Sequence, residues 1–466
     1  MASFTIDEIC RAAKGTVVHA GTAKRCTGVS TDTRHIEKGA LFIALKGERF
    51  DGHAFLEKAA AGGASAVLVS SLEETGALPP DVSVIQTADT LTAMEDLAHF
   101  HRCRFSIPVV AVTGSNGKTT TKNMIAALLE TRYQVRKTEK NHNNEIGLSQ
   151  TLLALTPSDQ VCVVEMGMRG LGQIARLAEI AAPTVGVVTN VSATHIGILG
   201  SMENIARAKS ELISALGPEG TAVLNEDDPY VKAMVSCTPG RVIGYGIGGN
   251  HTVQAVKIHY DPDRTQFVCS CFDEVFHVSL PLLGVHNVYN ALAAAGAARV
   301  LGVQVSKIQK ALAEFKPEEQ RQQVIHMDGI SILDDSYNAN PLSMDMAFRA
   351  MKQMKAVRRI LVLGDMMELG KYEKELHYET GEKAASYGFD GLITVGKASR
   401  NTAQGAREKG MRNVWECMSC EEAALLLEEK TRPGDLILIK GSHSMQMETI
   451  PDIWRRNRED HGHQLA

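Results

Sequence analysis

The sequence predicts an α/β fold divided into three domains, and three observations support this. The chain has 466 residues, which is more than one hydrophobic core usually holds. Short apolar runs bounded by glycine-bearing turns alternate with helix-forming segments along most of its length, as in parallel sheets covered by helices. Residues 316–321 are charged and contain a proline, as in a linker. We therefore expect domains at residues 1–106, 107–316 and 317–466.

The apolar runs indicate the strands of each domain. In the first domain they lie at residues 41–45 and 66–69, with a helix at 55–61. In the central domain a mostly parallel sheet is expected from 109–112, 161–164, 185–188 and 222–224, with appended antiparallel strands at 253–258 and 266–272 and a helix at 287–300. In the third domain strands at 359–363, 392–395 and 435–439 each run into glycine and a polar residue. Open α/β sheets bind ligands at that edge, so we expect a Rossmann-like domain.

Composition argues against several classes of protein. The 49 basic and 54 acidic residues leave a net charge of -5, which does not favour binding to nucleic acid or a membrane surface. The nine cysteines are scattered, and they suit a reducing compartment better than a disulfide framework. The N-terminus carries acids where a signal peptide would carry bases. Since no stretch approaches the ~20 apolar residues of a membrane span, we expect a cytoplasmic protein.

The most specific motif follows the predicted strand at 109–112. It reads Gly114-Ser115-Asn116-Gly117-Lys118-Thr119-Thr120 and leads into an amphipathic segment. Glycines let backbone N–H groups turn toward phosphate oxygens, and the start of a helix adds its positive dipole end. Lys118 would reach the β- and γ-phosphates of a nucleotide, and the Thr119 hydroxyl would bind Mg²⁺. The glycine spacing is shorter than in the common phosphate loop, which disfavours an ordinary GTPase or kinase.

Two further residues are placed to bind the metal ion of such a site. Glu165 directly follows the strand at 161–164, and His195 follows the strand at 185–188 after Thr-Asn-Val-Ser-Ala-Thr. Both therefore lie at carboxyl ends of strands, on the side of the phosphate loop. Taken alone, either would more often be a surface or capping residue, and the nearby phosphate loop is what favours a metal site.

Together with other motifs, these residues make the chain similar to the Mur ligase family along essentially its whole length. The shared motifs occur in order at residues 113–120, 141–147, 165–167, 190–195, 206–211, 284–294 and 334–341. Residues 30–34 and 46–53 resemble the uridine-diphosphate-binding domain of the two later-acting ligases. Residues 364–370, followed by His377, resemble the D-alanyl-D-alanine-adding member, and the Asp-Asn-Pro-Arg of the diamino-acid-adding member is absent from the sequence.

The resemblance implies a role for each motif. It implies catalytic roles for Lys118, Lys209, His195 and Arg321, with Arg321 near the phosphates. Thr119, Glu165 and His195 would surround magnesium, and Lys209 would be carbamylated and bind a second magnesium ion. Asn287 would lie by the adenine of ATP and Asp335 by its ribose. The implied substrate-binding residues are Ser30, Thr31, Asp32, Arg34, Lys46, Asp51, Asn143, Asn144, Asn338 and Asn340.

The implied activity is ATP-dependent formation of an amide bond through an acyl phosphate. The partners would be UDP-N-acetylmuramoyl-tripeptide and D-Ala-D-Ala, and the enzyme would act as a monomer in peptidoglycan synthesis. Two residues depart from the family pattern: His443 stands where an arginine is usual, and Gln173 replaces a glutamate. A neutral imidazole does not replace a permanent guanidinium fork. The alternatives are a folate polyglutamylating ligase, a small-molecule kinase and a nucleotide-gated binding protein, and the third residue of the tripeptide stays open.

Overall fold

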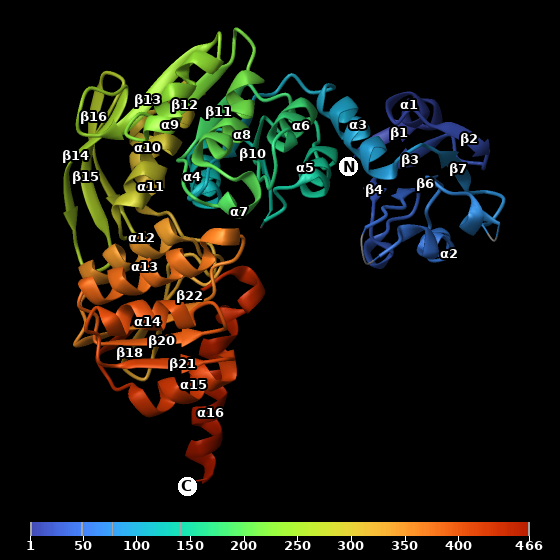
Figure 1. Ribbon diagram of the computed structural model, residues 1–466. Coiled ribbons are helices and arrows are strands. Elements are labelled where there is room, and N and C mark those ends of the chain that lie inside the picture. Colours follow the sequence, from blue (N-terminus) through green and yellow to red (C-terminus); the bar gives the residue numbers. More distant parts are fainter. Residues whose placement is uncertain (1, 48–49, 77, 140, 465–466) are drawn as a thin grey trace.

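The structure, a computed structural model, describes residues 2–47, 50–76, 78–139 and 141–464. Three α/β domains follow one another along the chain, and each is built on its own main sheet (Figure 1). The first domain lies to one side of the middle domain, and the third lies below it in this view. The predicted three-domain α/β fold is confirmed.

The first domain is small and mixed in strand direction. Its elements are β1 (Ser3–Thr5), α1 (Ile6–Ala12), β2 (Thr16–His19), β3 (Arg25–Thr27), β4 (Val29–Ser30), β5 (Leu41–Ile43), α2 (Leu56–Ala61), β6 (Ala66–Val69), β7 (Ser83–Gln86) and α3 (Thr90–Arg102), with 3₁₀ turns at Thr33–His35, Gly52–Phe55 and Glu73–Thr75. The main sheet has the order β2-β7-β6-β5-β4, in which only β2 is antiparallel to its neighbour. β1 and β3 form a separate antiparallel pair.

The middle domain contains the largest sheet. Its strands are β8 (Val109–Thr113), β9 (Val135–Lys137), β10 (Val161–Glu165), β11 (Val185–Val188), β12 (Thr221–Asn225), β13 (Arg241–Ile247), β14 (Val253–Tyr260), β15 (Thr265–Cys271) and β16 (Glu274–Leu280). Its helices are α4 (Lys118–Glu130), α5 (Glu145–Leu153), α6 (Gln173–Ala181), α7 (Ile196–Leu199), α8 (Met202–Ser214), α9 (Pro229–Ala233), α10 (Val285–Val300) and α11 (Val305–Ala313), with a 3₁₀ turn at Met234–Cys237. The strand order is β16-β15-β14-β13-β12-β11-β8-β10-β9. The strands from β9 to β14 are parallel, and β14, β15 and β16 form the expected antiparallel extension.

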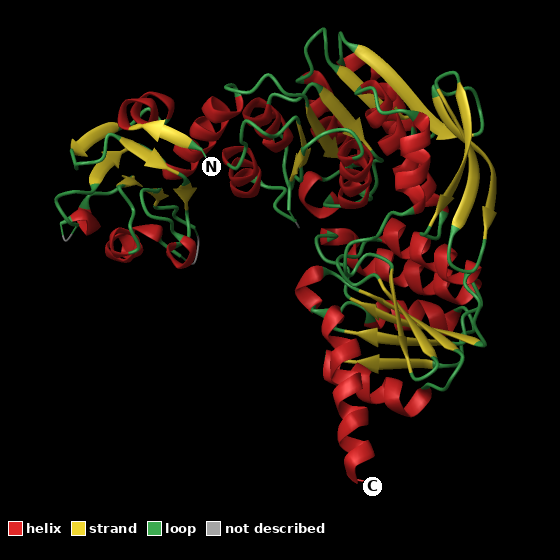
Figure 2. Cartoon of the chain, turned by 180° about the vertical axis from the view of Figure 1, so that it is seen from behind, coloured by secondary structure: helices red, strands yellow, loops and turns green. Residues whose placement is uncertain are grey.

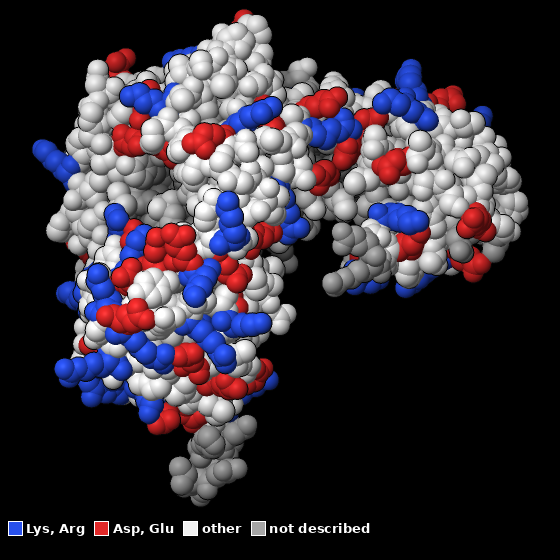
Figure 3. All heavy atoms as spheres, in the orientation of Figure 1, with Lys and Arg blue, Asp and Glu red and all other residues white. Residues whose placement is uncertain are grey.

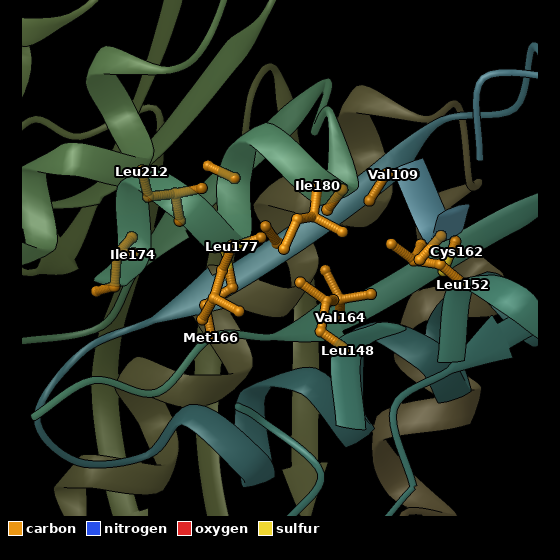
Figure 4. Close-up of a cluster of buried hydrophobic side chains, with 14 of the residues drawn as sticks. Val109, Leu148, Leu152, Cys162, Val164, Met166, Ile174, Leu177, Ile180 and Leu212 are labelled. Atoms are coloured by element: carbon orange, nitrogen blue, oxygen red, sulfur yellow. The ribbon is translucent and has the colours of Figure 1, made fainter. Parts of the chain in front are cut away.

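Strand β8 explains why the central strands are continuous apolar runs. Val109 and Ala111 pack into one core with helices α5, α6 and α8, and Figure 4 shows part of this core. Val110 and Val112 pack into a second core with α4 and α10 on the other face. A strand buried on both faces needs apolar side chains at every position.

The third domain repeats the parallel α/β plan, with helices on both sides of its sheet (Figure 2). Its elements are β17 (Gln323–Met327), β18 (Ile330–Asp334), α12 (Pro341–Gln353), β19 (Arg358–Gly364), α13 (Glu373–Ser386), β20 (Gly391–Val395), α14 (Arg400–Glu408), β21 (Val414–Cys417), α15 (Cys420–Lys430), β22 (Asp435–Lys440) and α16 (Ile450–Gln464), with 3₁₀ turns at Gly370–Tyr372, His443–Met445 and Met447–Thr449. The strand order is β17-β18-β22-β19-β20-β21. Strand β17 is antiparallel to β18, and the other neighbours are parallel. The three strands predicted here are confirmed as β19, β20 and β22.

Helix α3 joins the first domain to the middle one. It packs against α5 and α6, and Leu97 shares a core with Leu152 and Leu177 of those helices. The Arg176 guanidinium of α6 contacts Glu95 at 2.7 Å and Asp96 at 3.0 Å, both on α3. The first junction therefore combines apolar packing with a branched ion pair.

Two further properties of the fold concern its surface charge and its helices. Basic and acidic side chains are mixed across the face shown in Figure 3. Within the described part of the chain, no helix is both long and apolar enough to cross a membrane.

Candidate active site

A cavity of about 1030 Å³ lies where the middle and third domains meet. Its walls include the loops at the carboxyl ends of β8, β10 and β11 and loops of the third domain. The sequence-predicted residues that line it are Gly114, Ser115, Asn116, Gly117, Lys118, Thr119, Thr120, Asn143, Asn144, Glu165, His195, Lys209, Asn287, Arg321, Asp335, Asn338 and Asn340. The fold therefore brings the predicted residues of these two domains to one place.

The phosphate loop joins β8 to α4 and depends on two glycines. Gly114 has a φ of +147° and Gly117 a φ of +80°. A Cβ atom at Gly114 would lie 1.8 Å from the Thr189 hydroxyl oxygen, and one at Gly117 would lie 2.4 Å from the Asn290 side chain. The Lys118 ammonium donates to two carbonyl oxygens of the loop at 2.8 and 3.1 Å, and desolvation lowers the pKa of Lys118. The loop thus holds a cation where phosphates would bind.

Glu165, the last residue of β10, has an oxygen available for a cation. The side chain is buried, and its Oε1 accepts a hydrogen bond from the Asn143 amide at 2.9 Å. Its Oε2 is buried without a hydrogen-bond partner among the described residues. An unpaired buried carboxylate oxygen is costly, and Mg²⁺ prefers oxygen ligands. The arrangement therefore fits a magnesium ion.

The rest of a magnesium shell would not come from a cluster of acids. The described residues contain no group of three or more His, Cys, Asp or Glu side chains suited to a metal ion. The Thr119 hydroxyl lies in the same cavity as Glu165. Phosphate oxygens and water usually complete a magnesium site of this kind.

His195 contacts the third domain. It has a left-handed backbone, with a φ of +62°, and directly precedes α7. Its Nδ1 forms a short hydrogen bond with Glu368, and Arg169 Nε lies 3.4 Å from the other Glu368 oxygen. The hydrogen bond from His195 lowers the pKa of Glu368. Sequence reasoning gave Glu368 no role, although it lies within the motif at residues 364–370.

Lys209 is a buried amine on α8. It is 2% exposed, and burial together with the charge of Lys118 holds the pKa of Lys209 well below its usual range. Glu211, the acid with which a surface lysine would pair, instead accepts hydrogen bonds from the N–H groups of Gly172 and Ala175 at 2.7 and 3.0 Å. Lys209 is therefore not the exposed ion-pair partner that its sequence context alone would suggest.

The third domain brings an aromatic stack and an amide to the cavity. The Arg321 guanidinium carbon lies 3.8 Å from the centre of the Tyr337 ring. The His443 ring stacks on Tyr337 with 5.4 Å between ring centres, so this departure from the family arginine packs at the cavity wall. Asn340, the N-cap of α12, donates to the side-chain oxygen of Asn116 at 2.7 Å. The third domain thus contacts the phosphate loop directly.

The residues expected beside the nucleoside are held by polar partners. The Asn287 amide donates to Gln322 Oε1 at 2.8 Å, and Asp335 Oδ2 lies 2.6 Å from the Lys440 ammonium. Desolvation lowers the pKa of the neighbouring His286 to about 4, so this imidazole is neutral at pH 7. The wall expected to face the nucleoside therefore combines neutral amides with one ion pair.

The residues expected to bind the uridine nucleotide lie in the first domain and do not line this cavity. Asp32 accepts hydrogen bonds from the Arg34 guanidinium, which lower the pKa of Asp32. The Ser30 hydroxyl donates to the Asp32 carbonyl oxygen at 2.9 Å. Lys46 and Asp51 form an isolated β-bridge, and their side chains lie 3.7 Å apart. Residues 48 and 49, within the same motif, lie outside the described residues.

Helix α5 connects this first-domain motif to the cavity. Asn144 lines the cavity and caps the helix by accepting from the Gly147 N–H at 3.0 Å. Gln150, further along the helix, donates from its amide to the Thr31 hydroxyl at 3.2 Å. Six residues of helix span about 9 Å. The motif and the cavity therefore lie close to opposite ends of one short helix.

Gln173, the second departure from the family pattern, caps a loop beside the cavity. Its side-chain oxygen accepts hydrogen bonds from the N–H groups of Arg169 and Gly170 at 2.6 and 3.0 Å. An amide oxygen serves this purpose as a carboxylate would. The local structure therefore accounts for glutamine at this position.

Fold and cavity together define a class of protein: a three-domain α/β protein with a phosphate loop on its middle domain and a third domain that faces it. Comparison with known families identifies the family. Profiles match residues 25–102 (Mur ligase family, catalytic domain), 112–298 (Mur ligase middle domain) and 320–443 (Mur ligase, glutamate ligase domain). The chain belongs to the Mur ligase family.

Individual relatives cover nearly the whole chain. It is 38% identical over 455 residues to the UDP-N-acetylmuramoyl-tripeptide–D-alanyl-D-alanine ligase of Bacillus subtilis, which covers 97% of this chain and 98% of the relative. A crystal structure of MurF from Acinetobacter baumannii superposes with a TM-score of 0.89 at 29% identity, over 97% of this chain and 98% of that one. MurF ligase from Thermotoga maritima in complex with ADP gives a TM-score of 0.83 at 28% identity, over 93% and 98% of the two chains.

Proposed function

We propose that this chain is an ATP-dependent ligase that adds D-alanyl-D-alanine to UDP-N-acetylmuramoyl-tripeptide in peptidoglycan precursor synthesis. The proposal rests on one observation: the phosphate loop, Glu165 and Lys209 of the middle domain share a cavity with Arg321 and Asn340 of the third. Similarity to the Bacillus subtilis ligase along the whole chain supports the two substrates. The ADP complex of the Thermotoga maritima relative supports ATP as the phosphoryl donor.

The chemistry needs an activated acyl group, because a carboxylate is a poor electrophile. In the first step an oxygen of the tripeptide carboxylate attacks the γ-phosphorus of ATP. The bond from that phosphorus to the β–γ bridging oxygen breaks, so ADP leaves and an acyl phosphate forms. In the second step the dipeptide amine attacks the acyl carbon and loses a proton. The bond from that carbon to the phosphorylated oxygen breaks, and inorganic phosphate leaves with this former carboxylate oxygen.

Cations are central to the first step, because two anions must meet. Lys118 on the loop and Arg321 of the third domain would neutralise charge that develops on the transferring oxygens. Both side chains line the cavity. Water must be kept out, since an acyl phosphate hydrolyses, and closure of the third domain on the middle one would exclude it.

Magnesium fits the residues near the ends of β10 and β11. Glu165 has an unpaired buried oxygen, and Thr119 and His195 lie in the same cavity. Bound there, the ion would neutralise phosphate oxygens during transfer. Burial lowers the pKa of Lys209, which favours the neutral amine. It would add to CO₂ and lose a proton, and the resulting carbamate would bind a second magnesium ion.

The remaining residues would bind the organic parts of the substrates. Asn287 would contact adenine and Asp335 the ribose of ATP. Asn143 and Asn144 would contact the peptide, and the first-domain motif would bind the uridine diphosphate. Asn338 and Asn340 would lie by the incoming dipeptide. A cytoplasmic monomer with domains at 1–106, 107–316 and 317–466 is part of the same proposal.

The test measures ADP release from purified enzyme with ATP, Mg²⁺ and UDP-N-acetylmuramoyl-tripeptide, with and without D-Ala-D-Ala. We expect steady ADP release only when both acceptor and dipeptide are present. Hydroxylamine in place of the dipeptide should trap a peptidyl hydroxamate in an ATP-dependent way. ATP turnover with no hydroxamate, and with no oxygen exchanged between phosphate and carboxylate, would favour a kinase or a simple ATPase. Acceptors that carry lysine or diaminopimelate would identify the third residue.

A further inference from the structure

Two short segments from different domains lie in direct contact at the edge of the cavity. Residues 195–197 of the middle domain and 368–370 of the third form this contact, which we call the docking seat. The Gly197 N–H donates to the Glu368 carbonyl oxygen at 3.2 Å. Figure 1 places α7, which begins within the seat, at the side of the middle domain that faces the third.

The backbones of the docking seat touch so closely that side chains are excluded. A Cβ atom on Gly197 would lie 2.5 Å from the Gly370 nitrogen, and one on Gly370 would lie 2.8 Å from the Gly197 Cα. His195 and Glu368 have φ values of +62° and +61°. Non-glycine residues seldom adopt this conformation unless their surroundings hold them there. The docking seat therefore depends on two glycines without side chains and on two residues held in the left-handed conformation.

The contact defines which ring nitrogen of His195 donates to Glu368. A carboxylate only accepts hydrogen bonds, so His195 Nδ1 must carry the proton in this pair. In a neutral imidazole, Nε2 then keeps its lone pair. His195 lines the cavity, and Arg169 on the middle domain holds the second Glu368 oxygen.

We propose that Glu368 is a positioning residue through which the third domain orients His195. When the seat is formed, the carboxylate fixes the tautomer and the direction of the ring, so that Nε2 is available to a divalent cation. Hydrogen bonds of this kind from a carboxylate to a ligating histidine typically change metal affinity by about 10–100-fold. The inference deepens the proposed function, since it rests on His195 acting at the metal site. It also means that docking of the third domain contributes to metal binding.

The test uses the full-length protein with a non-hydrolysable ATP analogue and Mn²⁺ as the probe, with free Mn²⁺ measured by electron paramagnetic resonance. Glu368→Ala should weaken Mn²⁺ binding about tenfold, and Glu368→Gln, which keeps an acceptor but loses the charge, should lie between it and wild type. Glu375→Gln, which removes an exposed carboxylate on α13, is the matched control. Affinity for the analogue without a metal should stay unchanged in all three variants.

Two further variants test the route through the docking seat. Gly197→Ala keeps the side chains of Glu368 and His195 but forces their backbones apart, so it should also weaken Mn²⁺ binding. Gly217→Ala is its control, because a Cβ there would meet nothing within 4 Å. In the double variant His195→Ala/Glu368→Ala, Mn²⁺ should bind no more weakly than in His195→Ala alone, because Glu368 acts through that ring.

The outcomes separate the two proposals. If His195→Ala weakens Mn²⁺ binding tenfold while Glu368→Ala and Gly197→Ala stay within twofold of wild type, the positioning role is wrong and the metal role of His195 stands. If His195→Ala itself has no effect, the metal role is wrong and the positioning role falls with it. A double variant much weaker than His195→Ala would place Glu368 in direct contact with the cation, which also overturns the inference.

Discussion

The two interdomain junctions of this chain differ in the kinds of contact that form them. At the first, α3 packs its apolar side against the middle domain, and the Arg102 guanidinium donates to backbone carbonyl oxygens such as that of Ala181 at 3.0 Å. At the second, Leu283 of the middle domain packs into the core of the third, and polar pairs such as Asn116–Asn340 and His195–Glu368 lie beside a cavity of about 1030 Å³. We call the first the apolar junction and the second the polar junction, although each also contains contacts of the other kind.

This difference indicates what each junction is for. Apolar burial stabilises a contact whether or not a ligand is present. The polar junction presents cations, amides and carboxylates that substrates would contact, so its stability should depend on those substrates. We infer that the first junction fixes the first-domain motif, which we expect to bind uridine diphosphate, relative to α5, while the reactants complete the second.

The largest effect is expected from Lys118→Ala, which removes a cation from the polar junction and leaves the apolar one intact. Activity as kcat/KM should fall about 10³-fold, since a group that stabilises developing charge is lost. Thermal unfolding should stay as in wild type. Lys232→Ala, at an exposed lysine of α9, is the control. More than a tenth of wild-type activity in a natively folded Lys118→Ala variant would rule out the phosphate-loop role.

Lys209→Ala tests the buried amine at the same junction. We expect a loss of about 10²-fold in kcat, partly restored by a small carboxylate or by bicarbonate, because an added anion would take the place of the proposed carbamate. Lys209→Arg should be as inactive as the alanine variant, since a guanidinium does not form a carbamate under these conditions. Wild-type activity in the arginine variant would mean that position 209 supplies positive charge only.

Sequence patterns predicted the strands well where burial is continuous and less well at the edges. Strands β8 and β22 are buried at every position and contain runs of four apolar residues, so they are visible in the sequence. Strand β9 is half-buried and charged, and nothing in Val135–Lys137 distinguishes it from a loop. Glu165 and His195, which the sequence placed at the carboxyl ends of parallel strands, both line the cavity.

The sequence did not predict which residues of the site contact each other across the two domains. Glu368 was visible in its motif, but its partner His195 is 173 residues away in the chain. No local pattern encodes such a pair, because it arises from docking of two separately folded domains. The hydrogen bond from Gln150 to Thr31 has the same origin.

The apolar junction is broken most directly by Arg176→Met. Glu95 is 7% exposed in its side chain and would lose its cation, and burial already raises the pKa of Glu95. We expect the free energy of unfolding to fall by about 2 kcal/mol, because one partner of a buried pair is removed. Glu179→Gln, which removes an exposed partner of the same guanidinium, should change it by less than about 0.5 kcal/mol. Urea unfolding measures both. An Arg176→Met variant as stable as wild type would show that apolar packing alone holds this junction.

The smallest expected effect is on the pH dependence of stability. As the pH falls, titration of a residue at the polar junction lowers the free energy of unfolding, whereas titration at the apolar junction raises it. At the polar junction the pKa of His286 is lowered to about 4 by desolvation, whereas an unfolded histidine has a pKa near 6.5. Between these values the unfolded chain binds more protons, so the contribution of His286 to stability is present above about pH 6.5 and is lost as the pH falls toward 4. Glu95 at the apolar junction has a raised pKa, so its protonation favours the folded state and acts in the opposite direction.

His286→Gln keeps a polar side chain of similar size but removes the titration. Between pH 7.5 and pH 5.0 wild type should lose about 1–2 kcal/mol more unfolding free energy than the variant. His277→Gln, at an exposed histidine of β16, should follow wild type. Parallel pH profiles for wild type and His286→Gln would show that His286 is not held neutral, and that the polar junction has no special sensitivity to acid.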